Sequence, residues 1–570
     1  MSDKKERSQV ARPNAQGRAS FDWQLTHTSV NDTVRLIMPP TNTLPVIFVP
    51  GIMGSNLKDI DRKAVWRLDA AEFSLGETKM KIDQPVNLAR RWATKKAGAR
   101  QTALHPERVS LDPEGAVPSR RVGGIHTPAE FRARGWGEVG QTSYHTFLIW
   151  LERTLNEDNG LAHLSQAWTF DHERDGKHFG AEQAPFQTLS SDDLKKRAGW
   201  RYPVYAAGYN WLESNDIAAE SLRRRIVKII AENNRGAFRC KQVILVTHSM
   251  GGLVARACSE LQGMQEHIAG IVHGVMPATG AAVAYRRCKV GMRDEDWQAA
   301  IVIGATGKEV TAVFAQAPGA LQLLPTSDYG AGWLKITDAS GKVLAAMPGV
   351  DAKTGKADPY TDIYLRKDKW WGLVREEWLR PIDGKPIDWR DFQANVKKAK
   401  DFHDTLSKQY HPNSFVFYGA DTAQPSFESV RWLMKRGMQS GGGAASTAAQ
   451  VKDYSPAQVR DDGSNPVYVG RNTDVLPPYG GTMALFMPYE SNYDADFWEL
   501  HCAKQDSVGD GTVPESSGKG PTGTCGGGDK IKQQFRLTGF GHEKAYLNPR
   551  AQEVTLYAIT KITRQAKDPK

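Results

Sequence analysis

The sequence of 570 residues contains no uncharged apolar run long enough to cross a membrane, which takes about 18 residues or more. Its first twenty residues, MSDKKERSQVARPNAQGRAS, are polar and basic and lack the apolar segment that a secretory signal peptide requires. We therefore expect a soluble protein that is made in the cytoplasm, begins with a disordered basic leader, and leaves its cell only by a route that reads no such signal.

Cysteine is also scarce. The five cysteines have none of the spacings typical of metal sites, and we expect neither a metal nor a cofactor. A sparse, odd set of cysteines is typical of synthesis in a reducing compartment. Cys502 and Cys525 bracket a glycine-rich loop, so a disulfide between them in an oxidising compartment and two free thiols both remain open.

The net charge of +10 favours anionic surfaces, either nucleic acid or acidic lipid. The positive charges are dispersed and no nucleic-acid-binding motif is present, so we expect no nucleic-acid partner. A solvated basic surface is the simplest interpretation, and contact with anionic phospholipid is the more specific one.

Apolar strand patterns alternate with helical patterns along the first half of the chain, which predicts βαβ units and a mainly parallel sheet. These segments are 44–57, 202–211, 216–234, 242–262 and 268–280. The predicted fold class is therefore α/β, with two large insertions after strands. The expected organisation is a leader at 1–39, a first core part at 40–280, a cap insertion at 281–412, a core strand at 413–422, a second cap insertion at 423–495 and a last core part at 496–570.

The stretch VILVTHSMGGLV places a serine, Ser249, between a buried strand pattern and an Ala-rich helix pattern. This context is typical of a nucleophile elbow, in which small neighbours two residues on either side avoid clashes in a strained turn. Gly251 satisfies the pattern, whereas Thr247 stands where glycine is usual. The alternative is a structural serine at a strand–helix turn.

A serine nucleophile needs a base and an orienting acid, which follow it in this fold in the order acid, then histidine. His542, in the loop TGFGHEKAY after the last strand pattern, is the candidate base, and a loop histidine bonded to the backbone is the alternative. His248 adjoins the serine but is expected to point away and to be structural. His273, at a strand end, is a candidate for lining the site.

Asp510 is the candidate acid, because VGDGTVP is a tight loop after a strand pattern that exposes the carboxylate. Asp506 is the near alternative, and an Asx turn is the structural interpretation of either residue. The oxyanion hole needs two backbone N–H groups. We expect these from Met250 and from Ile52, with Met53 as the alternative to Ile52 and as a candidate for substrate contact.

Five segments together resemble the lecithin:cholesterol acyltransferase-like branch of α/β-hydrolases: VIFVPGIMGSNL, GYNW, VTHSMGGLVAR, FVFYGADT and GDGTVP. The elbow is also similar to that of eukaryotic glycosylphosphatidylinositol inositol-deacylases. The whole chain looks most like bacterial type VI secretion phospholipase effectors of the class likened to those deacylases. The resemblance implies an α/β-hydrolase fold with the triad Ser249, Asp510 and His542.

The resemblance also implies a biological setting. Such effectors are carried by a spike or tube component of the secretion system into the periplasm of a rival cell. There they degrade membrane phospholipid, and a cognate immunity protein restrains them at home. The motifs cover less than half of the chain and do not reach the caps, so head-group and acyl-chain preference are not implied.

The caps contain the aromatic segment WWGLVREEWL, with Trp370, Trp371 and Trp378 roughly on one helical face. Trp370 and Trp371 are candidates for substrate or membrane contact, because tryptophan favours membrane interfaces. The alternative interpretation is that these side chains form the core of the cap itself.

The leading hypothesis is a phospholipid acyl-ester hydrolase of the phospholipase A type. An acyltransferase, in which an alcohol replaces water, and a hydrolase of soluble esters or polyesters are alternatives within the same fold. A non-catalytic binding module on a hydrolase core is the alternative of another class, and the intact order Ser, Asp, His disfavours it.

Overall fold

A computed structural model describes most of the chain. The longer described ranges are 40–67, 94–156, 179–183, 186–293, 303–436, 448–470, 497–524 and 526–569. Shorter described pieces are 6–10, 12–13, 19–21, 33–37, 71–75, 78–82 and residue 92. Within these residues, no helix has both the length and the apolar character that crossing a bilayer demands.

The core is a six-stranded sheet in the order β13–β6–β14–β15–β18–β25, in which every neighbouring pair is parallel. The bounds are β13 (Val204–Ala206), β6 (Val46–Val49), β14 (Val243–His248), β15 (Ile268–Gly274), β18 (Ser414–Gly419) and β25 (Ile531–Leu537). All six residues of β14 are buried, as its continuous apolar run predicts for a strand covered on both faces. The predicted parallel α/β sheet is confirmed.

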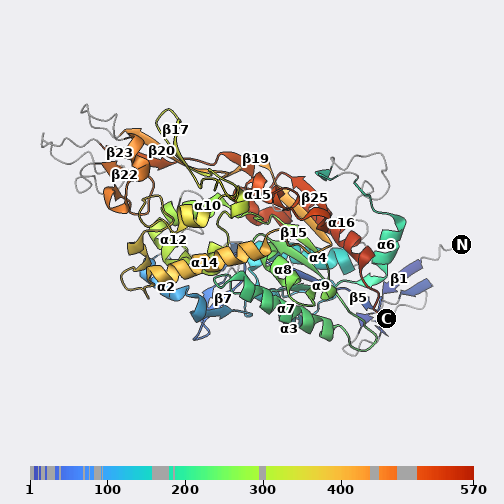
Figure 1. Ribbon diagram of the computed structural model, residues 1–570. Helices are drawn as coiled ribbons and strands as arrows, with labels where there is room; N and C mark the ends of the chain where they lie inside the picture. The colour runs from blue at the N-terminus through green and yellow to red at the C-terminus, as the bar shows by residue number, and fades with distance from the viewer. Residues whose placement is uncertain are drawn as a thin grey trace.

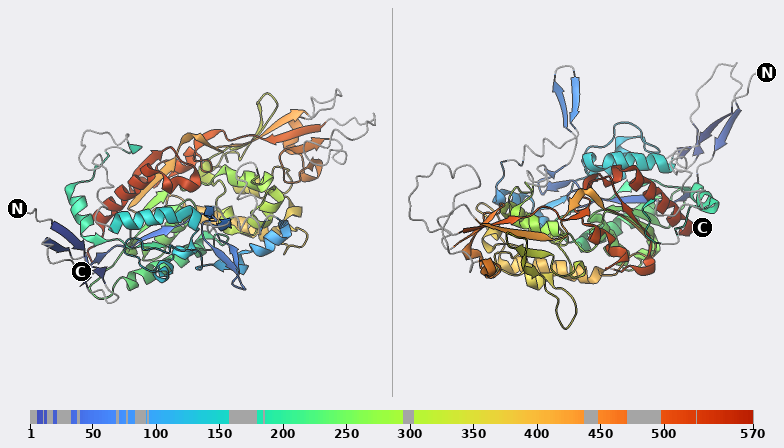
Figure 2. Two further views of the ribbon diagram at one scale, coloured as in Figure 1. Left: turned by 180° about the vertical axis from the view of Figure 1, so that it is seen from behind. Right: turned by 90° about the horizontal axis from the view of Figure 1, so that it is seen from above.

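Helices cover both faces of this sheet (Figures 1 and 2). One face carries α7 (Asn215–Glu232) and α8 (Gly251–Glu260), and the other carries α4 (Gln141–Asn156) and α16 (Pro549–Gln565). Two separate apolar clusters correspond to the two faces. The sheet is therefore the middle layer of three, and its carboxyl ends carry the loops in which the candidate site residues lie.

A second six-stranded sheet lies at the far end of the molecule from α6 (Ser191–Ala198) (Figure 1). Its order is β17–β16–β20–β23–β22–β21. The bounds are β17 (Val343–Met347), β16 (Leu334–Thr337), β20 (Val430–Arg436), β23 (Phe497–Cys502), β22 (Val467–Gly470) and β21 (Val459–Arg460). Strands from both predicted insertions thus share one sheet, and the two insertions form one cap.

β23 differs from its expected place. The sequence assigns residues 496–570 to the core, but β23 pairs with β20 and β22 in the cap sheet. An apolar strand pattern does not say which of two sheets a strand joins, since both bury it. The core resumes beyond β23, because β24 (Ser507–Gly509) pairs with β19 (Asp421–Ser426) beside the end of β18.

Two predictions fall largely outside the described residues. Most of the leader at 1–39 is not described, but β1 (Glu6–Val10) and β4 (Thr33–Ile37) pair in parallel where the sequence predicts disorder. A two-stranded pair of this kind has little stability of its own. Cys502 is buried in β23, whereas Cys525 lies outside the described residues, so their pairing stays a prediction.

A buried ion pair ties the two insertions together. Lys289, near the end of α10 (Ala282–Val290), lies 3.4 Å from Asp461 beside β21, and both side chains are fully buried. Lys289 Nζ also donates a hydrogen bond of 2.8 Å to the backbone carbonyl of Trp370. Burial lowers the pKa of Lys289, and the Asp461 carboxylate opposes that shift. Each side chain therefore compensates the buried charge of the other, and removing one would leave the other charge without a partner.

We expect Lys289→Met to lower the free energy of unfolding by about 3–5 kcal/mol, because it leaves the Asp461 charge buried without its partner. Urea unfolding followed by circular dichroism measures the change. Lys397→Met is the matched control: it removes an exposed helical pair with Asp401 and should cost less than about 1 kcal/mol. Similar midpoints for the two variants would contradict a structural role for the buried pair.

Candidate active site

The turn between β14 and α8 holds Ser249 in a strained conformation. Its φ is 53°, in the left-handed region that residues other than glycine seldom adopt. Helix α8 follows directly and packs closely, since a Cβ atom on Gly251 would lie 2.4 Å from the carbonyl oxygen of Val49. Thr247 fits in place of the usual glycine, fully buried in β14. The turn has the geometry expected of a nucleophile elbow.

His542 lies within hydrogen-bonding distance of both Ser249 and Asp510. It begins the 3-10 helix η13 (His542–Leu547), which follows β25. The Ser249 hydroxyl donates to His542 Nε2 at 2.8 Å, and His542 Nδ1–H donates to Asp510 Oδ2 at 2.8 Å. This tautomer follows from the carboxylate, which can only accept. The arrangement can move a proton from the serine to the imidazole while the carboxylate stabilises the resulting charge.

The Asp510 carboxylate is fixed from its other side. Its Oδ1 accepts the backbone N–H groups of Thr512, at 3.0 Å, and Val513, at 2.7 Å. The side chain is 1% exposed, and the backbone carbonyl of Asp510 accepts the N–H of His542 at 2.7 Å. The loop after β24 therefore holds both the carboxylate and the start of the histidine loop.

Asp506, the alternative acid, has a different environment. Its Oδ1 accepts the backbone N–H groups of Glu428, at 2.9 Å, and Ser429, at 3.1 Å. Its Oδ2 accepts the hydroxyl of Ser429. These contacts fix the turn before β20, so Asp506 has the structural role that the sequence left open for either aspartate.

The loop after β6 lies against the elbow. A Cβ atom on Gly51 would come within 2.9 Å of both His248 Nδ1 and Ser249 Cβ, which explains the glycine. Met53 has a positive φ of 62°, and its carbonyl accepts the indole N–H of Trp66 at 2.7 Å. In the described part of the chain, no protein group accepts the N–H of Ile52, Met53 or Met250. These donors are available for an oxyanion, and the choice between Ile52 and Met53 remains open.

His273 lies at the end of a strand, as expected, but it is buried in the core. It lies on β15, fully buried, with Nδ1 3.4 Å from Thr247 Oγ1 and its ring edge-on to Tyr410. Burial lowers its pKa to about 3, so it is neutral. Helices cover both faces of the sheet, so a side chain on this central strand is buried whichever face it is on. His273 is therefore a core residue and does not line the site.

Trp370 and Trp371 are core residues of the cap, 1% and 5% exposed. Their indole N–H groups each donate a 2.8 Å hydrogen bond, to the backbone carbonyls of Val451 and Lys452. Trp370 also packs edge-on against Trp432 of the cap sheet. The expected substrate or membrane contact is wrong for these side chains, because the second insertion covers them and satisfies their polar atoms.

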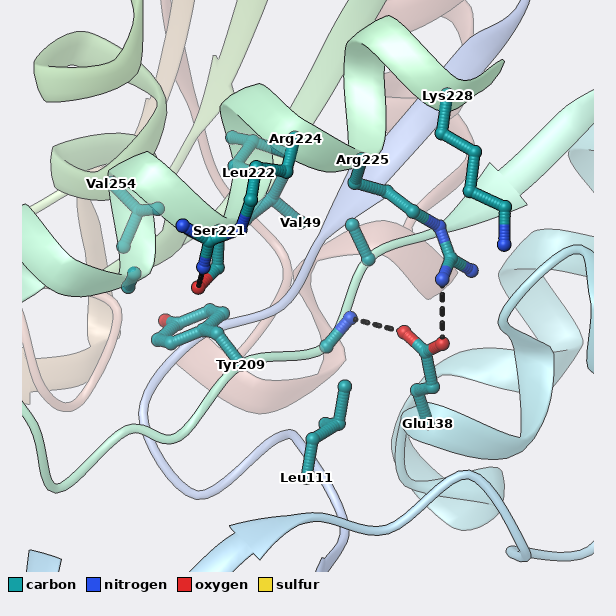
Figure 3. A pocket seen from close by; sticks show the side chains of 13 residues that line it. Val49, Leu111, Glu138, Tyr209, Ser221, Leu222, Arg224, Arg225, Lys228 and Val254 are labelled. Carbon is teal, nitrogen blue, oxygen red and sulfur yellow. Dashed lines mark hydrogen bonds and ion pairs between the residues drawn. The ribbon is translucent and has the colours of Figure 1, made fainter. Parts of the chain in front are cut away.

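A pocket of about 250 Å³ opens between α7 and the loop after β13 (Figure 3). Glu138 lines this pocket, where its carboxylate accepts the N–H of Gly208 at 3.1 Å and forms an ion pair with Arg225 at 3.0 Å. Burial raises the pKa of Glu138, and Arg225 opposes the shift. None of the three candidate catalytic residues lines this pocket, so it is separate from the site around Ser249.

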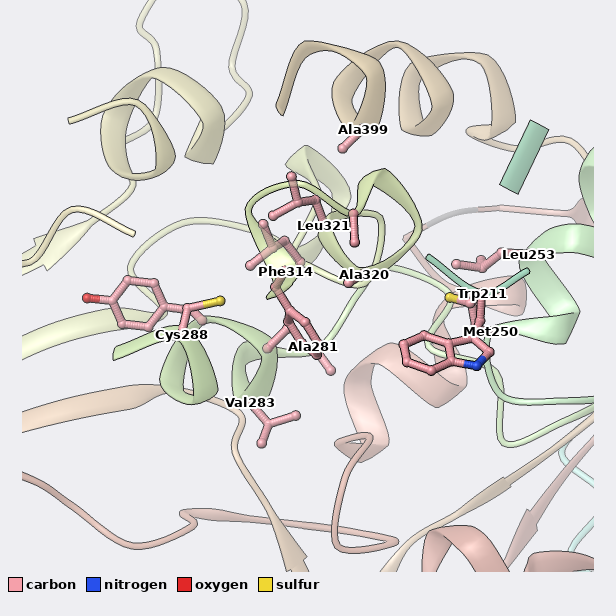
Figure 4. Packing of buried hydrophobic residues seen from close by; sticks show 14 of the residues in the cluster. Trp211, Met250, Leu253, Ala281, Val283, Cys288, Phe314, Ala320, Leu321 and Ala399 are labelled. Carbon is pink, nitrogen blue, oxygen red and sulfur yellow. The ribbon is translucent and has the colours of Figure 1, made fainter. Parts of the chain in front are cut away.

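Apolar side chains of the cap belong to the same cluster as those of the helix that follows the nucleophile (Figure 4). Met250, Leu253 and Trp211 belong to one apolar cluster that continues through α10 and α12 (Gly307–Phe314) into the cap sheet. Ser249 is 5% exposed beside this cluster. The nucleophile is therefore almost buried, with its hydroxyl facing His542 and the apolar cluster beginning at the next residue, Met250.

Comparisons with known proteins agree with this geometry. A family profile described as "PGAP1-like alpha/beta domain" matches residues 215–292, which include the elbow and β15. The crystal structure of the Tle4–Tli4 complex contains a chain that is 29% identical, with a TM-score of 0.67. The match covers 91% of this chain and 98% of that one. The chain is similar to Tle4 over nearly its whole length. No curated protein sequence matches it.

The likeness to Tle4 confirms the resemblance to type VI secretion phospholipase effectors that the sequence predicts. The PGAP1-like match confirms the expected likeness to the inositol-deacylases and, with Tle4, the α/β-hydrolase fold. Together the two matches support a lipase-type hydrolase. Neither match tests the catalytic roles of Ser249, Asp510 and His542, and the last two lie outside residues 215–292.

The assignment of Asp510 predicts a large effect of one substitution. We expect Asp510→Asn to lower kcat on a short soluble ester by up to about 10⁴-fold, because an amide can hold His542 in the wrong tautomer. Asp506→Asn is the matched control and should lower thermal stability while the folded enzyme keeps its kcat. A loss of kcat in the Asp506 variant with none in the Asp510 variant would mean that the acid is misassigned.

Proposed function

We propose that this protein is a serine hydrolase that cleaves acyl esters of membrane phospholipids through an acyl-enzyme on Ser249. The observation that carries the proposal is the double contact of the His542 ring, with Ser249 on one nitrogen and Asp510 on the other. A structural serine or a structural histidine has no need of this arrangement, whereas acyl transfer requires it.

In the proposed mechanism, Ser249 Oγ attacks the ester carbonyl as His542 Nε2 takes the hydroxyl proton. The oxyanion that forms accepts the N–H of Met250 and that of Ile52 or Met53. The tetrahedral intermediate collapses when His542 returns the proton to the leaving lysophospholipid oxygen. A water molecule then attacks the acyl-enzyme by the reverse sequence, and the fatty acid leaves with the oxygen of that water.

Three features support a phospholipid substrate. The apolar cluster beside Ser249 offers an environment for an acyl chain once the cap moves. The net charge of +10 favours approach to anionic bilayers. Tle4, to which the chain is similar throughout, supports the same class of substrate. Because Ser249 is only 5% exposed, catalysis on a bilayer requires that the site open at the interface.

The same likeness supports the antibacterial role that the sequence predicts. The solved relative is a complex of Tle4 with Tli4. By analogy, this chain binds a cognate immunity protein in the cell that makes it. A spike or tube component of the type VI secretion system then delivers it to the periplasm of a target cell, where its phospholipid substrate is accessible.

Release of lysolipid and fatty acid from vesicles of mixed bacterial phospholipids tests this function. We expect Ser249→Ala to abolish release while circular dichroism stays unchanged, because no other hydroxyl is bonded to His542 Nε2 in the described residues. Ser221→Ala, on the exposed side of α7, is the control and should match wild type.

The outcomes are distinct. Release that persists in Ser249→Ala at wild-type level would remove the nucleophile assignment. Turnover of short soluble esters without any release from vesicles would retain the serine hydrolase and remove the phospholipid substrate.

A further inference from the structure

His248, directly before the nucleophile, connects two loops of the site. Its side chain is buried at 4% exposure. Nε2 lies 2.9 Å from the backbone carbonyl oxygen of His542, and Nδ1 lies 3.1 Å from the hydroxyl of Tyr144 on α4. A structural histidine facing away from the site would need no contact with the catalytic loop.

The direction of each hydrogen bond in this arrangement follows from its acceptors. The His542 carbonyl can only accept, so His248 Nε2 must carry a proton. Because the imidazole is neutral, Nδ1 is then unprotonated and can accept a hydrogen bond. The Tyr144 hydroxyl therefore donates to Nδ1. The Tyr144 oxygen in turn accepts the backbone N–H of Gly51 at 3.2 Å. One directed chain runs from Gly51 through Tyr144 and His248 to His542.

The two ends of this chain are the two parts of the site that must be aligned. Gly51 precedes Ile52 and Met53, the candidate oxyanion donors, and His542 is the candidate base. The glycines of the loop leave room for the chain, because a Cβ atom on Gly54 would lie 2.6 Å from the Tyr144 hydroxyl. A shift of either loop relative to the other would lengthen a hydrogen bond in the chain.

Both linking side chains stay neutral. Burial lowers the pKa of His248 to about 3, with His542 adding to the shift and Asp510 opposing it. Burial raises the pKa of Tyr144, with the nearby Glu543 adding to the rise and the Gly51 N–H opposing it. Neither group gains or loses a proton between about pH 5 and 8, where imidazole switches usually act. The hydrogen bonds from Gly51 to His542 therefore keep the same donors and acceptors across this range.

We propose that His248 and Tyr144 are positioning residues that set the oxyanion loop and the base of this hydrolase relative to each other. The inference rests on the proposed function, since it assigns a role only if Ser249, His542 and the loop after β6 catalyse acyl transfer. His248 then acts through the backbone of His542, and Tyr144 acts through the backbone of Gly51. Neither side chain takes part in the proton transfer.

Two substitutions of His248 separate positioning from simple packing. An asparagine amide reaches the position of Nδ1 and can still accept from Tyr144, but it leaves the His542 carbonyl without a donor. A glutamine amide reaches the position of Nε2 and can still donate to that carbonyl. We expect His248→Asn to lower kcat on a short soluble ester by about 10²-fold with KM close to wild type. We expect His248→Gln to restore part of that loss and to lose no more kcat than Tyr144→Phe, because it keeps the donor to the His542 carbonyl and loses only the bond to Tyr144.

Tyr144→Phe tests the other half of the chain with almost no change of volume. It removes the acceptor of the Gly51 N–H and the donor to His248, and we expect a fall in kcat with KM close to wild type. Because the two residues act through one chain, the double variant Tyr144→Phe/His248→Asn should lose no more than the worse single variant. The single variant Tyr144→Phe also keeps the test decisive if His248→Asn fails to fold.

A wild-type kcat in folded His248→Asn or in Tyr144→Phe would overturn the proposal. Equal falls in kcat in His248→Asn and His248→Gln, in proportion to their losses of thermal stability, would also overturn it. Ser249→Ala distinguishes this failure from failure of the proposed function. If Ser249→Ala is inactive and the other variants behave as wild type, only the positioning role is wrong. If Ser249→Ala retains hydrolysis, the proposed function itself is wrong.

Discussion

The geometry of the site depends on the left-handed backbone conformation of Ser249. A side chain in this conformation persists only where its surroundings hold it. Here the constraint comes from close backbone packing: Gly251 lies against the carbonyl of Val49, and Gly51 lies against the side chains of His248 and Ser249. The same contacts bring the loop after β6, the elbow and the loop of His542 to one place. A larger residue at either glycine would displace the nucleophile from its base.

The cap is the second determinant of the site. Its apolar core is continuous with the helix that follows the nucleophile, and its sheet combines strands from both insertions. The buried pair of Lys289 and Asp461 fastens those insertions to each other. If the site opens by a movement of the cap, we expect the two insertions to move together, because they share one sheet and this buried pair. An acyl chain or an interface that replaces the lost apolar contacts can compensate for that movement.

Much of the fold and of the candidate site could be predicted, because strand patterns followed by glycine-rich loops locate Ser249, Asp510 and His542. The structure brings these three side chains into hydrogen-bonding contact, while their catalytic role stays a prediction. The positions of Trp370 and Trp371 could not be predicted, because the same aromatic pattern suits an interface and a core. Tyr144 gave no signal, since its helix reads as an ordinary buried helix and the contact with His248 joins residues far apart in sequence.

The proposed function requires that one serine of this protein be activated for acyl transfer. Reaction of the native protein with a fluorophosphonate, followed by intact mass and peptide mapping, tests it most directly, because the reagent phosphonylates only an activated serine. We expect a single adduct, on the peptide that contains Ser249, and none when the protein is denatured first. An adduct on another residue, or no adduct on a native protein whose cap has been opened by detergent micelles, would contradict it.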